Sequence, residues 1–293
     1  MKDYVNMRTI IALTLAALLC LCVLKVKEAS AMNVDPVIIA TVTPSVPSAE
    51  EIYHDVITPE TVMEDAPTLA FPMPVVEYLD VETGVTKHQF TASNGIKVPF
   101  NLYVPEGATT DMPMIIWLHG MGYLNRELPE NYGVIQMVQE LCDNRFIVVQ
   151  PTASYGWHVS KQFNAVMEMT DYIVSEYQID DDRIILTGHS LGSLGTWYYA
   201  EAAHDRWAAV APVANRCVNA LKVLPESDLP VWAFSGTGDT KENINGQQRT
   251  VDSFLKINPD RDVQHTVLKG SHNDMAEAPY TVEFFDWAAE QVR

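Results

Sequence analysis

The sequence has little positive charge. Its 293 residues include 19 Lys and Arg against 38 Asp and Glu, a formal net charge of −19. A surface this acidic repels nucleic-acid phosphates and anionic membrane surfaces, so we expect no nucleic-acid partner. Because 47% of the residues are hydrophobic, the acidity does not indicate a disordered protein. A chain of this length can bury a large core.

Cysteine is also scarce. Two of the four cysteines, Cys20 and Cys22, lie near the N-terminus, which leaves Cys142 and Cys217 for the rest of the chain. Two cysteines cannot build a disulfide framework, although they could form one bridge or stay as two buried thiols. No C-x-x-C motif or Cys/His cluster indicates zinc. We therefore expect no zinc site.

The N-terminal segment resembles a secretory signal peptide. Residues 9–24 are uncharged and follow Lys2 and Arg8, and small residues with A-x-A spacing follow at 29–31. This pattern predicts cleavage after Ala31 and a secreted protein without stable membrane insertion. The alternative is an uncleaved N-terminal membrane tether, but the uncharged run is shorter than the roughly 20 residues that span a bilayer.

Residues 32–75 lack glycine, lysine and arginine. They contain seven prolines, and seven acidic residues lie between Asp35 and Asp65. Proline at this density interrupts both helices and strand ladders, so we expect an extended acidic spacer with little structure. A pro-segment or a tether is a possible role for it. The sequence then predicts one catalytic domain over 76–293.

From residue 76 onward, apolar runs typical of strands alternate with helical patterns. This alternation predicts an α/β fold with a mostly parallel sheet covered by helices on both faces. Strands are expected at 88–92, 96–104, 112–118, 146–150, 183–187, 207–213, 231–235 and 263–268. Helices are expected at 130–142, 163–177, 191–203, 250–257 and 281–292.

The most specific local signal is a G-x-S-x-G motif at 188–192, directly after a predicted strand and directly before a predicted helix. The serine of such a motif occupies a tight, strained turn, and the two glycines let strand and helix approach each other. The helix N-terminus then favours negative charge near the serine. Ser190 is therefore the candidate nucleophile.

A serine hydroxyl needs a base, and the base needs an orienting acid. In this fold the order is serine, acid, histidine, with the acid and the histidine each just past a strand. Asp239 and His272 meet this condition, although Glu242 and Asp274 are alternative acids. His265 lies inside its strand, where a structural role is expected.

Acyl transfer also requires hydrogen-bond donors for the developing oxyanion. The N–H of Leu191, directly after the nucleophile, is the first candidate. The loop after the strand at 112–118 offers the second, for which we favour the N–H of Met121. His119 is expected to support this loop rather than to transfer protons, and His189 is expected to pack.

Several segments resemble the secreted serine esterases of the α/β-hydrolase superfamily, a group with feruloyl and acetylxylan esterases, polyhydroxybutyrate-depolymerase-like enzymes and predicted peptidases. The resemblance extends over about 86–293 and rests on residues 98–105, 117–120, 179–184, 188–192 and 195–197. It implies an α/β-hydrolase fold with Ser190, Asp239 and His272 as nucleophile, acid and base. One departure is Ser193, where many relatives have a second glycine.

We therefore expect a secreted serine hydrolase that cleaves a small or carbohydrate-linked carboxylic ester through an acyl-enzyme. This hydrolytic mechanism implies neither a metal nor an organic cofactor. One alternative is a serine peptidase of the same fold, because amide hydrolysis uses the same groups. A second is a non-catalytic binding module on a hydrolase scaffold, which an intact serine, aspartate and histidine set disfavours. The sequence indicates neither the specific ester nor the oligomeric state.

Overall fold

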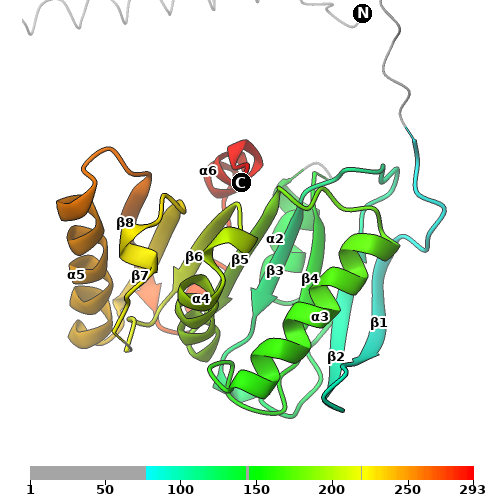
Figure 1. Cartoon of the computed structure of the whole chain (residues 1–293), viewed down its shortest axis with the longest axis horizontal. Coiled ribbons are helices and arrows are strands. Elements are labelled where there is room, and N and C mark those ends of the chain that lie inside the picture. The colour runs from blue at the N-terminus through cyan, green and yellow to red at the C-terminus, as the bar shows by residue number, and fades with distance from the viewer. Residues whose placement is uncertain (1–76, 143–144, 219) are drawn as a thin grey trace, which may run out of the picture. The chain divides into compact units, whose positions relative to one another are not determined.

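The computed structural model describes residues 77–142, 145–218 and 220–293, which all lie in one compact unit, Phe71–Arg293. The signal peptide predicted at 1–31 and the spacer predicted at 32–75 fall outside the described residues. The described chain is an α/β domain with one central sheet, as the sequence predicts (Figure 1).

The described residues form an eight-stranded sheet in the order β1-β2-β4-β3-β5-β6-β7-β8. The six strands from β4 to β8 are parallel, while β2 runs antiparallel to both β1 and β4. The strands are β1 (Gly84–Thr91), β2 (Lys97–Val104), β3 (Met114–Leu118), β4 (Ile147–Pro151), β5 (Ile184–His189), β6 (Ala209–Val213), β7 (Val231–Gly238) and β8 (Val263–Ser271).

Helices cover both faces of the sheet because the central strands are apolar on both sides. On β3, Ile116 packs into one buried cluster with α3, α4 and α5, whereas Trp117 packs into a second with α2 and α6. Figure 1 shows α3, α4 and α5 in front of the sheet. The helices are α2 (Val134–Leu141), α3 (Ser160–Glu176), α4 (Leu191–Ala202), α5 (Lys241–Ile257) and α6 (Val282–Glu290).

The largest difference from the predicted elements is the start of α5. A helix is predicted at 250–257, but α5 begins at Lys241, after Thr240. The Thr240 hydroxyl accepts a hydrogen bond from the Asn243 N–H at 3.2 Å and so caps the helix. The first turns of α5 are polar, and a periodicity of apolar residues therefore does not detect them.

The possible disulfide and the expected absence of a membrane span both concern the described residues. Cys142 and Cys217 are not joined by a disulfide, so the described domain depends on packing rather than on a bridge between them. No helix among the described residues is both long enough and apolar enough to cross a bilayer.

The backbone packs very closely where α4 leaves β5. A Cβ atom added to Gly192 would stand 1.8 Å from the backbone carbonyl oxygen of Leu118, at the end of β3. No side chain fits at that distance, so only glycine allows α4 to start this close to the sheet.

Gly192→Ala should therefore lower the free energy of unfolding by about 3 kcal/mol or more, because α4 must shift away from β3. Chemical denaturation measures this loss. Gly122→Ala is a matched control, since a Cβ added there meets nothing within 4 Å, and we expect a change of less than about 0.5 kcal/mol. Equal stability of the two variants would contradict the argument.

Candidate active site

Ser190 lies in a strained turn between β5 and α4. Its backbone has φ of 57° and ψ of −108°, a positive φ that is uncommon for a residue other than glycine. The Ser190 N–H donates to the Val213 carbonyl at 2.9 Å, which ties the turn to the end of β6. The strain is thus held by the neighbouring strand, as happens at sites that must present a side chain.

The structure brings Ser190, His272 and Asp239 together from three different strand ends. The Nε2 atom of His272 lies 2.8 Å from the Ser190 hydroxyl oxygen, and its Nδ1 atom lies 3.1 Å from an Asp239 carboxylate oxygen. The Asp239 side chain is 2% exposed and that of His272 is 35% exposed. A carboxylate that accepts the Nδ1–H leaves Nε2 able to accept the hydroxyl proton.

The other oxygen of the Asp239 carboxylate is held in place as well. It accepts hydrogen bonds from the Thr240 N–H at 2.7 Å and from the Asn243 amide at 3.0 Å. No sequence signal points to Asn243, because Asp239 lies before the N-cap Thr240 and the start of α5 has no apolar periodicity. Because these bonds hold Oδ1, the remaining carboxylate oxygen, Oδ2, stays directed to His272.

The alternative residues have other contacts. Asp274 accepts the Ser271 N–H at 2.7 Å and closes the turn after β8, and Glu242 is exposed in the first turn of α5. His265 lies within β8, as expected, where its ring nitrogens contact Gln248 and Ser235. Among the described carboxylates, only that of Asp239 is within hydrogen-bond distance of His272.

Leu191 and Met121 are each the first residue of a helical segment close to Ser190. Leu191 is the first residue of α4, so its N–H has no acceptor within the helix. Met121 starts the 3₁₀ helix η2 (Met121–Tyr123), directly after Gly120. A Cβ added to Gly120 would stand 3.4 Å from the Ser190 Cβ, so this loop passes close beside the serine.

His119 supports the loop that carries Met121. Its Nδ1 atom lies 2.7 Å from the Gly120 carbonyl oxygen, and its Nε2 atom accepts the Ala153 N–H at 3.0 Å. Nδ1 must therefore carry the hydrogen, and it donates to the Gly120 carbonyl. That carbonyl and the Met121 N–H belong to one trans peptide and point in opposite directions, so His119 fixes the direction of the N–H.

His189 makes a contact that the expectation of simple packing did not include. Its Nε2–H donates to the main-chain carbonyl of His272 at 2.7 Å, and the two rings lie 5.0 Å apart between centroids. Burial lowers the pKa of His189 to about 4, which keeps the ring neutral. The residue before the serine therefore holds the loop that carries His272.

Comparisons with known proteins agree with this architecture. The family model named BD-FAE matches residues 100–196, and the model of the prolyl oligopeptidase family matches residues 155–254. Together the two matches extend over the strands and loops that carry Met121, Ser190 and Asp239.

The curated relatives are esterases. A bifunctional acetylxylan esterase/xylanase of Neocallimastix patriciarum is 29% identical over 179 residues, which are 58% of this chain and 25% of that protein. Acetylxylan esterase A of Emericella nidulans is 26% identical over 129 residues, 40% of this chain and 41% of the relative. The chain thus spans less than half the length of these relatives.

Solved structures show the same fold. A thermostable esterase has a TM-score of 0.60 and 21% identity, with 71% of this chain and 63% of that chain covered. The feruloyl esterase module of Clostridium thermocellum has a TM-score of 0.54 and 17% identity, with 71% and 94% covered. The chain therefore has the α/β-hydrolase fold. The predicted resemblance to the esterases of this superfamily is confirmed.

The buried histidines make stability depend on pH. Burial lowers the pKa of both His119 and His189 from 6.5 to about 4, so each ring binds a proton more readily in the unfolded chain. Stability should be complete above about pH 6.5 and decrease as the pH falls toward 4, by about 3 kcal/mol for each ring.

His119→Asn should reduce this dependence, because the variant lacks one of the two buried rings. Urea denaturation between pH 7 and 4 measures the slope of the unfolding free energy. We expect a less stable protein at pH 7, because the bond to Ala153 is lost, but a shallower decrease on acidification. If the unfolding free energy of the variant decreased as steeply with falling pH as that of the wild type, His119 would not contribute to the pH dependence.

Proposed function

We propose that this protein is a serine carboxylic ester hydrolase in which Ser190, His272 and Asp239 are the catalytic residues. The observation that supports it best is the continuous pair of contacts from Ser190 Oγ to His272 at 2.8 Å and from His272 to Asp239 at 3.1 Å. The strained turn that presents the serine and the esterase relatives support the same conclusion.

The reaction begins when His272 Nε2 removes the hydroxyl proton of Ser190 as the oxygen attacks the ester carbonyl carbon. Asp239 keeps the proton on Nδ1 and stabilises the imidazolium that forms. The N–H groups of Leu191 and Met121 bind the oxyanion of the tetrahedral intermediate. His272 then protonates the leaving alcohol, and the acyl group stays on the serine.

The second half of the reaction uses the same groups in reverse. His272 removes a proton from a water molecule, which attacks the acyl-enzyme carbonyl, and returns it to Ser190 as the carboxylic acid leaves. No step requires a metal or an organic cofactor.

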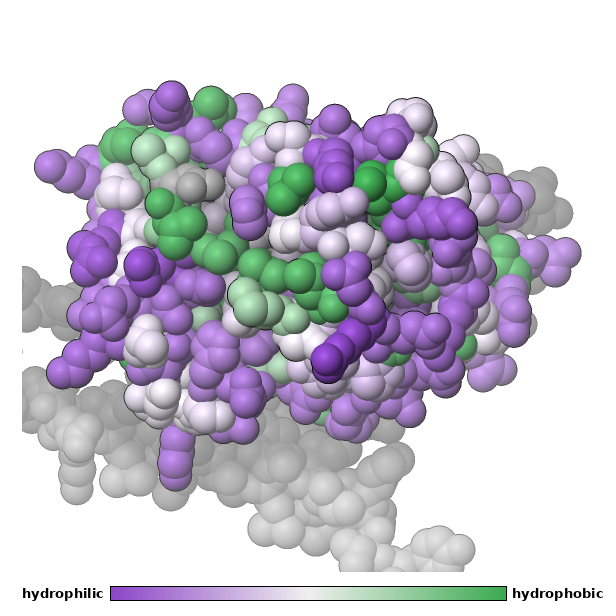
Figure 2. Space-filling view, turned by 90° about the horizontal axis from the view of Figure 1, so that it is seen from below, coloured by the Kyte–Doolittle hydropathy of each residue, from purple (hydrophilic) through white to green (hydrophobic). Residues whose placement is uncertain are grey.

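The surface near these residues supports a polar substrate. Figure 2 views the molecule from the side to which the parallel strands point, and this face is largely hydrophilic with a band of hydrophobic residues. Such a face suits a small or carbohydrate-linked ester better than a long-chain fat. The acetylxylan esterases among the relatives support a carbohydrate ester.

A serine peptidase of the same fold is the second candidate. It is favoured by the match of residues 155–254 to the prolyl oligopeptidase family model. Comparing nitrophenyl acetate with a nitroanilide peptide distinguishes the two functions, because only a peptidase releases the poorer amine leaving group efficiently.

The proposal also includes the organisation of the chain that the sequence predicts. The catalytic unit extends over 76–293, and the N-terminal segment directs the protein out of the cell before cleavage after Ala31. Residues 32–75 then form a spacer ahead of the enzyme.

Replacing the proposed nucleophile is the direct test. Ser190→Ala should reduce kcat for nitrophenyl acetate by about 10⁴-fold or more, because no oxygen remains to form the acyl-enzyme. The loss should be accompanied by loss of labelling with a fluorophosphonate probe.

A matched variant controls for damage to the turn. Ser193→Ala removes a hydroxyl in the first turn of α4. This hydroxyl donates to the Asn215 carbonyl at 2.8 Å and does not contact His272. It should keep activity within about tenfold of the wild type and retain labelling. Full activity in Ser190→Ala would refute the proposed mechanism.

A further inference from the structure

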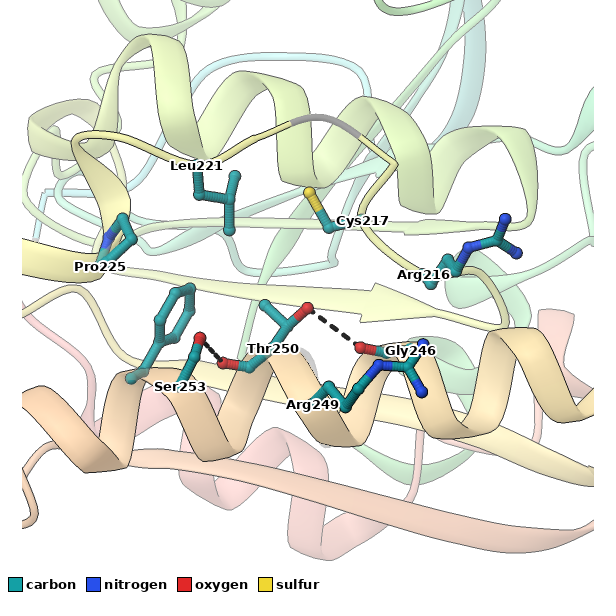
Figure 3. A pocket seen from close by; sticks show the side chains of 9 residues that line it. Arg216, Cys217, Leu221, Pro225, Gly246, Arg249, Thr250 and Ser253 are labelled. Atoms are coloured by element: carbon teal, nitrogen blue, oxygen red, sulfur yellow. Dashed lines mark hydrogen bonds between the residues drawn. The ribbon is translucent and has the colours of Figure 1, made fainter.

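A pocket of about 320 Å³ lies between α5 and the loop that follows β6. Figure 3 shows Arg216, Cys217 and Leu221 on the loop side and Arg249, Thr250 and Ser253 on the helix side. The volume is at the lower end of the range for small-molecule sites, enough for about one sugar unit. The proposed reaction makes no use of this pocket.

Two arginines share the pocket. The aliphatic stem of Arg216 crosses α5 at Gly246, where an added Cβ would stand 2.5 Å from the Arg216 Cβ and 2.6 Å from its Cδ. Arg249 follows Gly246 by three residues, so it lies on the same side of the helix one turn later. Figure 3 shows both guanidinium groups toward the same end of the pocket.

Neither arginine has an anionic partner among the described residues. Arg145, Arg206 and Arg293 each form an ion pair with an aspartate, but no carboxylate of the described chain lies within 4.0 Å of Arg216 or Arg249. In a protein with a net charge of −19, two neighbouring arginines without an acid form an isolated positive site. The guanidinium group is suited to paired hydrogen bonds with a carboxylate.

The other lining groups suit a sugar. The Thr250 hydroxyl donates to the Gly246 carbonyl at 3.1 Å, and the Ser253 hydroxyl donates to the Thr250 carbonyl at 2.7 Å. Both oxygens therefore keep lone pairs that can accept hydrogen bonds from a ligand. Leu221, which is half-buried, adds apolar surface for a sugar ring.

The pocket is close to the catalytic residues along both of its walls. On the loop side, the Asn215 amide donates to the main-chain carbonyl of Ser190 at 3.3 Å, and Arg216 is the next residue. On the helix side, Asn243 contacts Asp239, and Gly246 follows one helical turn of about 5 Å later. Both walls of the pocket therefore begin next to residues that contact Ser190 or Asp239.

From these observations we propose that the pocket binds a carboxylate group on the carbohydrate substrate, beside the ester that is cleaved. The inference rests on the proposed esterase function. The ligand class is a largely neutral oligosaccharide with an isolated uronic acid unit. A dense polyanion would be repelled by the net charge of −19, whereas a single carboxylate meets two arginines.

The test compares two acetylated xylo-oligosaccharides that differ in one branch, which is glucuronic acid in one and glucose in the other. Wild-type kcat/KM should be about tenfold higher for the acidic substrate. The double variant Arg216→Gln, Arg249→Gln should lose this preference and should retain hydrolysis of nitrophenyl acetate, which does not reach the pocket.

Lys256→Gln is the matched control. It removes one positive charge from an exposed position on the same helix, outside the pocket. The single variants Arg216→Gln and Arg249→Gln, which also remove one charge each, are measured beside it. If general attraction of anions caused the preference, Lys256→Gln would weaken it as much as either of them does. We expect Lys256→Gln to keep the wild-type preference, and an equal loss would overturn the inference.

Equilibrium binding separates this inference from the esterase function. Calorimetry with the deacetylated acidic oligosaccharide should show about tenfold tighter binding than with the neutral one, and the double variant should abolish the difference. Equal binding of the two sugars would overturn the pocket assignment and leave the esterase proposal intact. If the wild-type protein did not hydrolyse nitrophenyl acetate at all, the esterase proposal would instead be refuted.

Discussion

The contact between the start of α4 and the end of β3 is the constraint on which the rest of the site depends. The backbone of Gly192 lies against the Leu118 carbonyl, so the helix can follow β5 only through a very tight turn. That turn forces Ser190 to a positive φ and raises its hydroxyl above the strand ends. Because the same strand β3 continues into the loop with Gly120 and Met121, one contact brings together the serine and the loop beside it.

Separate contacts hold the individual parts of the site. His119 holds the peptide between Gly120 and Met121, and His189 holds the main chain of His272. Both rings are buried and neutral, so they act through hydrogen bonds and not through charge. Asp239 is held separately, from the first turn of α5 through Asn243. The loop of Met121, the main chain of His272 and the carboxylate of Asp239 thus each have a separate attachment to the fold.

Much of this arrangement could be predicted from the sequence, because strand ends and turn residues leave local signals. The motif at 188–192 indicates the position of Ser190, and the order of the elements indicates Asp239 and His272. The polar start of α5 could not be predicted from periodicity, because its residues face solvent and neighbouring loops. The bond from His189 to His272 joins residues 83 apart in sequence, and the pocket combines Arg216 with Arg249, so both depend on tertiary packing.

The loop after β3 has one further consequence. Met121 is proposed to contribute only its main-chain N–H, while its side chain is 67% exposed next to Ser190. A main-chain donor is supplied by every amino acid except proline. The side chain at position 121 can therefore change without loss of the hydrogen bond that the N–H is proposed to make. Sequence divergence at this position therefore changes a side chain beside Ser190 and keeps the main-chain donor.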